Sequence, residues 1–301
     1  MAKERLDARA FAVLFTLTLL WGLNYVAVKI SNTGLSPVFT TALRSCIASA
    51  CGLLLCLSIG QTVFHRGMLL LHGLVVGMLF GCEFVCLYLG LLYTDASRAV
   101  ILVYLSPFFV AILAHLFLKE RLTLAKSIGL FLAFSGLWFI FAGRPVTYTR
   151  KMLIGDMLEV AAAVLWALTT VYIKRFLAER VHPINTFIYQ LFFSIPVMLL
   201  FSCALEPRWV TNLSGPVIAS VLFQSVVVAF LSYLAWFRLI HTYPVAQLSS
   251  FTFLTPVFGV VFGMILLKEE ASPWLFLSLA LVSMGIYTTN ATRPFSFLRR
   301  T

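Results

Sequence analysis

Two apolar segments far apart in the chain each place a tryptophan one helical turn before polar side chains. These residues are Trp21, Asn24 and Tyr25 in residues 19–29, and Trp166, Thr169 and Thr170 in residues 164–174. In a helix each set lies on one face, because residues three and four apart are neighbours. Amides, hydroxyls and aromatic rings suit the binding of a small polar molecule. The same groups could instead serve packing and hydrogen bonding between helices, which needs no ligand.

Two ionisable residues, Arg44 and Glu83, lie inside long apolar runs. A charge at the centre of a bilayer costs at least about 2.5–3.5 kcal/mol on insertion scales, so such a residue usually has a partner or a function. If the two runs are adjacent helices, the residues differ in depth by about 5 Å, within the reach of an arginine side chain. The sequence is compatible with a fixed structural pair, and also with a pair that opens so that Glu83 takes up a proton.

Further polar residues and two prolines interrupt other apolar runs. The polar candidates are Tyr104, Gln247 and Ser250, with Ser232, Tyr233 and Trp236 as weaker ones. Pro107 and Pro256 lie near the middle of their runs, where each removes a backbone hydrogen bond and can kink a helix. A carbonyl freed in this way is tolerated where protein or a wet cavity satisfies it. The prolines therefore indicate either gating or helix shape alone.

The remaining charges in these regions are expected to have structural roles at helix ends. Glu120 follows an apolar run and should lie near the start of the next helix, where the helix dipole favours an anion. Asp156 and Glu159 should lie near the start of their own helix, where the same placement suffices.

These side chains belong to a chain that is 61% hydrophobic and 11% charged, with a mean hydropathy of +0.99. A soluble domain carries roughly twice this share of charge. Apolar runs of about 20 residues recur along the whole length, and each can cross a bilayer as a helix. The sequence thus predicts an all-α integral membrane protein. The net charge of +11 does not indicate a nucleic-acid partner, because Lys and Arg gather at the edges of the runs.

Ten membrane-spanning helices are predicted, joined by connections too short to hold a soluble domain. They cover residues 10–30, 37–58, 68–93, 96–118, 123–142, 154–175, 185–205, 216–238, 245–267 and 273–290. The cysteines have no His or Cys partners at zinc-ligand spacing, so neither a metal nor another cofactor is expected. No nucleophile–base pair stands at a membrane edge, which argues against an enzyme.

The distribution of Lys and Arg predicts the orientation. If the N-terminus is cytoplasmic, the cytoplasmic ends and loops hold about twice as many of these residues as the other side. This bias favours cytoplasmic termini, with basic tails at residues 1–9 and 291–301.

The chain also repeats itself. Residues 19–29 and 164–174 agree at Leu20/Leu165, Trp21/Trp166, Leu23/Leu168, Val26/Val171 and Lys29/Lys174. YLSPFFVAILAHLFLKE, residues 104–120, likewise matches FLTPVFGVVFGMILLKE, residues 253–269. The predicted repeats are residues 10–142 and 154–290, with five helices each. Because five is odd, the second repeat enters the membrane from the opposite side, an inverted-topology arrangement used by many secondary transporters.

The first-helix motif LLWGLNYVAVK and the paired blocks SPFFVAILAHLFLKERLT and TPVFGVVFGMILLKEE resemble the EamA family of the drug/metabolite transporter superfamily. The resemblance covers about residues 10–290. It implies ten helices with both termini cytoplasmic, a central cavity lined by both halves, and export of small metabolites such as amino acids.

The leading hypothesis is a secondary transporter in the bacterial inner membrane that exports a small polar metabolite, an amino acid or a relative, by alternating access. One alternative is efflux of cationic drugs, with Glu83 holding the cation and aromatic faces adding attraction. A channel or a non-transporting membrane subunit is another. The expected partners are a small-molecule substrate and the lipid bilayer, and the protein is either a monomer or a homodimer.

Overall fold

A computed structural model describes residues 6–94, 96–141, 150–268 and 274–290. The described residues are almost entirely helical, and their only β-type contact is an isolated bridge between Leu35 and Val210. The predicted C-terminal tail, residues 291–301, and most of the N-terminal tail lie outside the described residues.

Eight helical segments among the described residues are long and apolar enough to cross a membrane. Five of them are single helices: α1 (Ala8–Ser31), α2 (Pro37–Ser58), α3 (Met68–Tyr93), α7 (Arg150–Phe176) and α8 (Pro183–Leu205). Two shorter apolar helices, α6 (Leu124–Phe141) and α13 (Leu275–Asn290), accompany them.

The other three long segments are interrupted. One consists of α4 (Ala96–Val103) and α5 (Ser106–Leu118), separated by a turn at residues 104–105. The second joins α9 (Gly215–Leu222), the π-helix η1 (Phe223–Ser232) and α10 (Tyr233–Thr242). The third joins α11 (Val245–Ser250), the short 3-10 helix η2 (Phe251–Phe253) and α12 (Leu254–Leu267).

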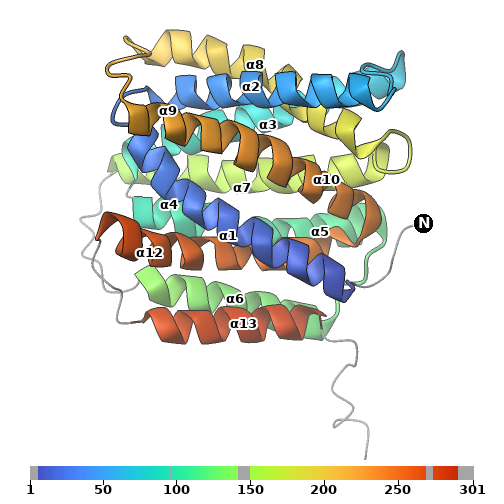
Figure 1. The fold of residues 1–301 in the computed structure, drawn as a ribbon. Helices are drawn as coiled ribbons and strands as arrows, with labels where there is room; N and C mark the ends of the chain where they lie inside the picture. Colours follow the sequence, from blue (N-terminus) through green and yellow to red (C-terminus); the bar gives the residue numbers. More distant parts are fainter. Residues whose placement is uncertain (1–5, 95, 142–149, 269–273, 291–301) are drawn as a thin grey trace, which may run out of the picture.

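The helices run roughly side by side, and several neighbours are far apart in sequence (Figure 1). The α1 helix packs on α12 and on the α9–η1 segment, whereas α3 packs on α7 and α8. The α6 and α13 helices pack on each other at one edge of the bundle. The first and second halves of the chain are therefore interleaved rather than separate.

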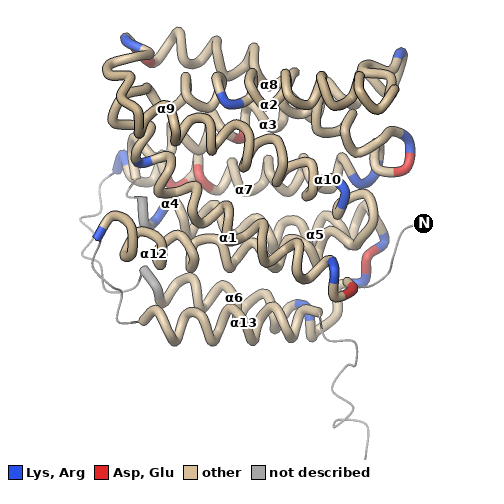
Figure 2. Tube along the Cα trace, in the orientation of Figure 1, with Lys and Arg blue, Asp and Glu red and all other residues tan. Residues whose placement is uncertain are grey.

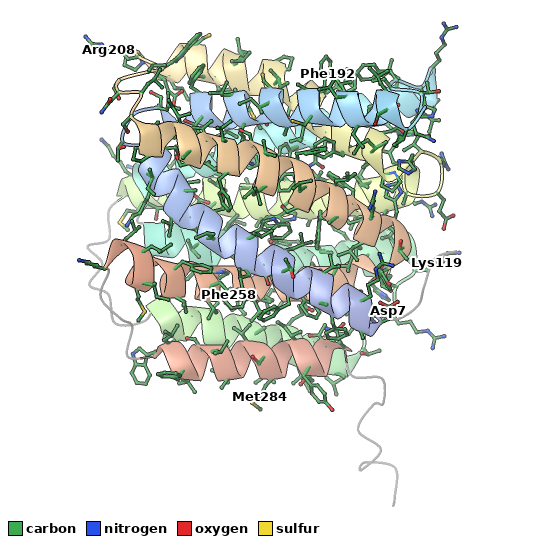
Figure 3. All side chains as sticks on the ribbon, viewed as in Figure 1. Asp7, Lys119, Phe192, Arg208, Phe258 and Met284 are labelled. Carbon is green, nitrogen blue, oxygen red and sulfur yellow. The ribbon has the colours of Figure 1, made fainter. Side chains whose placement is uncertain are left out.

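Charged residues gather at two opposite ends of the bundle, and the belt between them is mostly uncharged (Figure 2). Asp7 and Lys119 mark one end, called here the N-terminal end, and Arg208 marks the opposite end (Figure 3). Large apolar side chains such as Phe192 and Met284 are exposed in the belt between the two ends. An apolar belt with polar ends is the surface that a bilayer requires.

Two glutamates at helix ends join distant parts of the chain. Glu120 accepts hydrogen bonds from the backbone N–H groups of Val245 (2.9 Å) and Ala246 (3.3 Å), at the start of α11. Glu206 accepts from Val38 and Phe39 at the start of α2, both at 2.8 Å. The sequence placed Glu120 at the start of the helix that follows it, and this placement was wrong. Its carboxylate does accept hydrogen bonds from the free N–H groups at a helix start, but that helix, α11, lies in the other half of the chain.

Candidate functional site

Aromatic side chains from both halves of the chain meet in the middle of the bundle. This aromatic cluster consists of Trp21, Tyr25, Tyr104, Trp166, Tyr233 and Trp236. Trp21 and Tyr25 stand one turn apart on α1, so they share one face of that helix as the sequence spacing predicts. The α1 helix thereby contributes to both sides of the cluster.

Trp21 forms the first side of the cluster, against the η1–α10 segment. Its ring lies edge-on to Tyr233 and Trp236, with centroids 6.3 and 5.4 Å apart. Its indole Nε1 donates a 2.8 Å hydrogen bond to Ser232 Oγ. Ser232 is the last residue of the π-helix, a form of helix that occurs frequently at functional sites.

Tyr25 forms the second side. Its hydroxyl lies 3.4 Å from the hydroxyl of Tyr104, which occupies the turn between α4 and α5. The Tyr104 ring in turn lies 6.3 Å from the ring of Trp166 on α7. Tyr104 is buried whereas Tyr25 is 38% exposed, so Tyr25 retains free surface beside the cluster.

Arg44 and Glu83 are both buried, but no ion pair joins them in the part of the chain that the structure describes. Arg44 Nη2 donates to the Tyr233 hydroxyl at 3.2 Å, and the guanidinium lies over the rings of Phe84 (4.9 Å) and Tyr233 (5.9 Å). Its Nε has no hydrogen-bond partner. The guanidinium is therefore held by aromatic faces and one hydroxyl, and it joins the edge of the aromatic cluster.

The remaining predicted residues differ in their surroundings. Asn24 Oδ1 and Gln247 Oε1 are buried acceptors without a hydrogen-bond partner. Thr169 Oγ1 donates back to Leu165 O at 2.8 Å. Ser250 accepts from Asn290 Nδ2 at 3.3 Å, so it faces α13 in this conformation. The other predicted threonine, Thr170, is buried.

Both prolines follow a break in their membrane segment. Pro107 lies in the first turn of α5, directly after the turn that carries Tyr104. Pro256 is the third residue of α12, directly after the 3-10 turn η2. At each place the α-helical pattern of backbone bonds is already interrupted, so the missing N–H of proline costs little. Whether the breaks gate anything stays a prediction.

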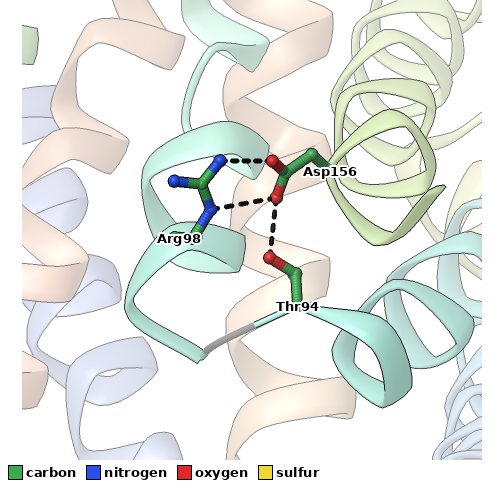
Figure 4. A network of polar contacts seen from close by, with 3 residues as sticks. All are labelled: Thr94, Arg98 and Asp156. Atoms are coloured by element: carbon green, nitrogen blue, oxygen red, sulfur yellow. Dashed lines mark hydrogen bonds and ion pairs between the residues drawn. The ribbon is translucent and has the colours of Figure 1, made fainter. Parts of the chain in front are cut away.

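A polar network at the end opposite the N-terminus was not expected from the sequence (Figure 4). Asp156 accepts from Thr94 Oγ1 at 2.6 Å and from Arg98 Nε at 3.2 Å, and it forms an ion pair with Arg98 Nη2. The α7 helix begins at Arg150, four residues before its predicted start, so Asp156 lies in the second turn. Its partners at the end of α3 and on α4 hold it, rather than the N–H groups of its own helix.

Glu159, one turn further along α7, was also missed as a site residue. It is completely buried, and neither carboxylate oxygen has a hydrogen-bond partner. A Cβ added at Gly90 of α3 would lie 2.5 Å from Glu159 Oε1, so this glycine leaves the room that the carboxyl group occupies. The sequence did hold a signal for this position. Glu159 and Trp166 stand seven residues apart, so they share the helix face that was predicted to line the centre.

These features define a polytopic membrane protein whose centre holds aromatic rings together with polar groups that are unfavourable against lipid. The sequence model of the EamA-like transporter family matches residues 9–142 and residues 153–291. The chain therefore belongs to the EamA-like transporter family.

Relatives named as transporters agree with this membership, and a solved structure has the same fold. The chain is 24% identical over 288 residues to the uncharacterized transporter YoaV of Bacillus subtilis, covering 95% of this chain and 97% of YoaV. It is 22% identical over 275 residues to a probable amino-acid metabolite efflux pump of Escherichia coli, covering 89% and 90%. A protein of known crystal structure has the same fold, with a TM-score of 0.82, 22% identity, and coverage of 94% and 96%.

Proposed function

We propose that the protein is a secondary transporter that exports a small polar metabolite, an amino acid or a related compound, by alternating access. The observation that carries the proposal is the aromatic cluster, where side chains of both halves meet beside buried polar atoms of Asn24 and Arg44 that lack partners. Asn24 offers an unpartnered acceptor and Arg44 an unpartnered donor, which suits a ligand with both kinds of group; Gln247 holds a further buried, unpartnered acceptor. The similarity to probable amino-acid metabolite efflux pumps supports this substrate class.

The proposed architecture is ten membrane helices in two inverted repeats of five. Packing between α6 and α13 supports it. A Cβ added at Gly285 would meet Gly129 and Ala133, and a Cβ added at Gly136 would meet Ser278 and Val282. Ser278 and Val282 stand 149 positions after Gly129 and Ala133, so the two sets of contacts correspond. Gly136 and Gly285 are themselves 149 positions apart.

Backbone conformation repeats with the same offset. Lys119 and Lys268 both end their helices with positive φ, at 59° and 56°. The helix pairings also correspond between the halves. The third membrane helix of the first half, α3, packs on the first two helices of the second half, α7 and α8, and the third membrane segment of the second half, α9–α10, packs on α1 and α2. Two halves related in this way can exchange conformations, which is the basis of alternating access. We place both termini in the cytoplasm and the protein in the bacterial inner membrane, on the positive-inside bias of the sequence.

Efflux of cationic drugs is the second candidate. The buried carboxyl groups of Glu83 and Glu159, together with the aromatic cluster, could bind an organic cation by charge and by cation–π attraction. Arg44 argues against it, because a fixed cation in the same region repels a second one.

Counterflow in proteoliposomes tests the proposal. Vesicles with purified protein are loaded with an unlabelled amino-acid mixture and diluted into a trace of the same mixture in radiolabelled form. A transporter for any component produces transient accumulation of the label, and pairs of single amino acids then identify it. Cationic dyes run in parallel decide the second candidate. No counterflow with either set would reject both.

A further inference from the structure

Among the acidic residues that the structure describes, Glu159 is the buried one with the fewest groups around it that could stabilise a negative charge. Its exposure is 0%, and both oxygens lack hydrogen-bond partners. An isolated carboxylate in an apolar interior is so unfavourable that the group holds a proton instead. In this arrangement Glu159 is therefore a neutral carboxylic acid.

The surrounding groups do not provide a counter-charge. On α7 itself Asp156 is the nearest charge and it is negative, and Arg98 of α4 is engaged with it. Cys86 of α3 and Tyr25 of α1 lie near enough to interact electrostatically with the Glu159 carboxyl group. The other titratable or charged groups on helices packed against α7 are His72, Cys82, Glu83, Tyr88 and Tyr93 of α3, His115 of α5, and Tyr233, Arg238 and His241 of α10.

Glu159 stands between the polar network and the aromatic cluster. Asp156 is one turn before it on the same helix face, about 4.5 Å along the axis, and Trp166 is two turns after it. The contacts of Asp156 with Thr94 and Arg98 lie between Glu159 and the end opposite the N-terminus (Figure 4). Separation of these contacts would bring water to Glu159 from that side, and opening of the aromatic cluster would do so from the other.

We propose that Glu159 is the proton-binding group through which this protein couples export to the inward proton gradient. When the centre opens to the cytoplasm, the carboxyl O–H bond breaks, the proton passes to water, and the carboxylate is left free for a substrate ammonium group. When the centre opens outward, the substrate leaves and the carboxylate takes a proton from external water. One proton enters for each substrate exported, and no electrons are transferred. This coupling rests on the proposed function.

A measurement without substrate tests the proton itself. Infrared spectra of the purified protein at neutral pH are compared for the wild type, Glu159→Gln and, as the control, the exposed Glu179→Gln. The carbonyl band of a protonated carboxylic acid should be present in the wild type and in the control, and reduced in Glu159→Gln. Gln should also leave thermal stability nearly unchanged, because one neutral group replaces another of the same shape. An unchanged band in Glu159→Gln would overturn the proposal.

Transport in proteoliposomes tests the coupling. In the wild type, an inward proton gradient of one pH unit should drive up to about a tenfold accumulation of the radiolabelled amino-acid mixture in the direction of export. Glu159→Gln should lose this accumulation and also show weaker counterflow, because the variant lacks the carboxylate that binds the substrate ammonium group. Glu159→Asp should recover part of the accumulation, because it keeps an ionisable group.

The outcomes separate the two proposals. Counterflow in the wild type without any response to the pH gradient would refute the coupling and leave the transporter assignment intact. Equal gradient-driven accumulation by the wild type and Glu159→Gln would also refute it. Absence of wild-type counterflow would refute the proposed function, and the infrared comparison would then decide alone whether Glu159 carries the proton.

Discussion

Alanine at Gly285 or at Gly136 should force α6 and α13 apart. A Cβ added at Gly285 would lie 2.5 Å from both the carbonyl oxygen of Gly129 and the amide nitrogen of Ala133. At Gly136 the added Cβ would lie 2.7 Å from the carbonyl oxygen of Ser278. These neighbours are backbone atoms, so no side-chain rotation can relieve the contact.

The cost follows from the distances. Non-bonded carbon atoms rest about 3.5–4.0 Å apart, so each methyl group demands a separation of about 1 Å. A gap of about 0.5–1 Å forfeits a quarter to a half of the dispersion energy of the contacts that it opens. Insertion of a methyl group into a packed interface typically costs about 1–3 kcal/mol, and we expect each single variant to lie in that range.

The double variant should be less destabilised than the sum of the two singles. One separation of the helices makes room for both methyl groups, and substitutions that share a structural adjustment are not additive. The measurement is unfolding of the purified protein in mixed micelles with increasing denaturing detergent, followed by tryptophan fluorescence. Gly215→Ala is the control, because a Cβ there meets nothing within 4 Å.

Two results would refute this reasoning. If both single variants were as stable as the Gly215→Ala control, α6 and α13 would not approach as closely as described. If the double variant lost the full sum, the two glycines would act in separate contacts rather than in one interface.

Three further predictions concern single hydrogen bonds and charges. Trp21→Phe removes the hydrogen bond to Ser232, so it should cost about 0.5–1.5 kcal/mol of stability and reduce counterflow. Trp21→Phe combined with Ser232→Ala should cost little more than Trp21→Phe alone, because both changes remove the same hydrogen bond. A double variant whose loss equals the sum of the two single losses would contradict this. His182 accepts a hydrogen bond from the Ile184 N–H at the start of α8, and partial burial and the neighbouring Arg238 lower its pKa. Its stabilising contribution is therefore complete above about pH 6.5 and is lost as the pH falls through the lowered pKa. His182→Asn should make the melting temperature less dependent on pH over that range, and an unchanged profile would contradict this prediction. Burial raises the pKa of Glu120 above its usual value of about 4.3. The contribution of Glu120 to stability is therefore complete below about pH 4.3 and is lost as the pH rises through the raised pKa. Melting curves of Glu120→Gln should lack this pH dependence, and a variant that keeps it would show that another group titrates.

Helix positions were predictable because the contrast between apolar and polar residues is sharp at a membrane boundary. The segments 37–58 and 68–93 begin and end where the structure has α2 and α3. The start of α7 at Arg150 was missed by four residues, since Arg150 and Lys151 read as loop although long basic side chains can extend from a helix end to water. The π-helical form of residues 223–232 has no proline or glycine to signal it.

The candidate site was predictable only one helix at a time. Periodicity placed Trp21 and Tyr25 on one face of α1, but it carries no information on which distant helix meets that face. The contacts to Ser232 and Tyr104 therefore came from the structure alone. Glu159 was assigned to a helix start because the predicted boundary lay too close to it, and a carboxyl group near a helix N-terminus needs no further explanation.

The interleaving of α1 with the second half has a consequence for the order of synthesis. The α1 helix emerges first, yet its packing partners α9, η1 and α12 are complete only at residue 267. At about 5–20 residues per second, the intervening stretch of about 240 residues takes roughly 10–50 seconds to translate. Until residues 232–236 are made, the indole of Trp21 lacks Ser232, Tyr233 and Trp236, and α1 has only its few contacts with the first half, among them α2 and Tyr104. A chain that stops after its first half would leave α1 without its main packing partners permanently, and only the contact between Tyr25 and Tyr104 could form at the centre.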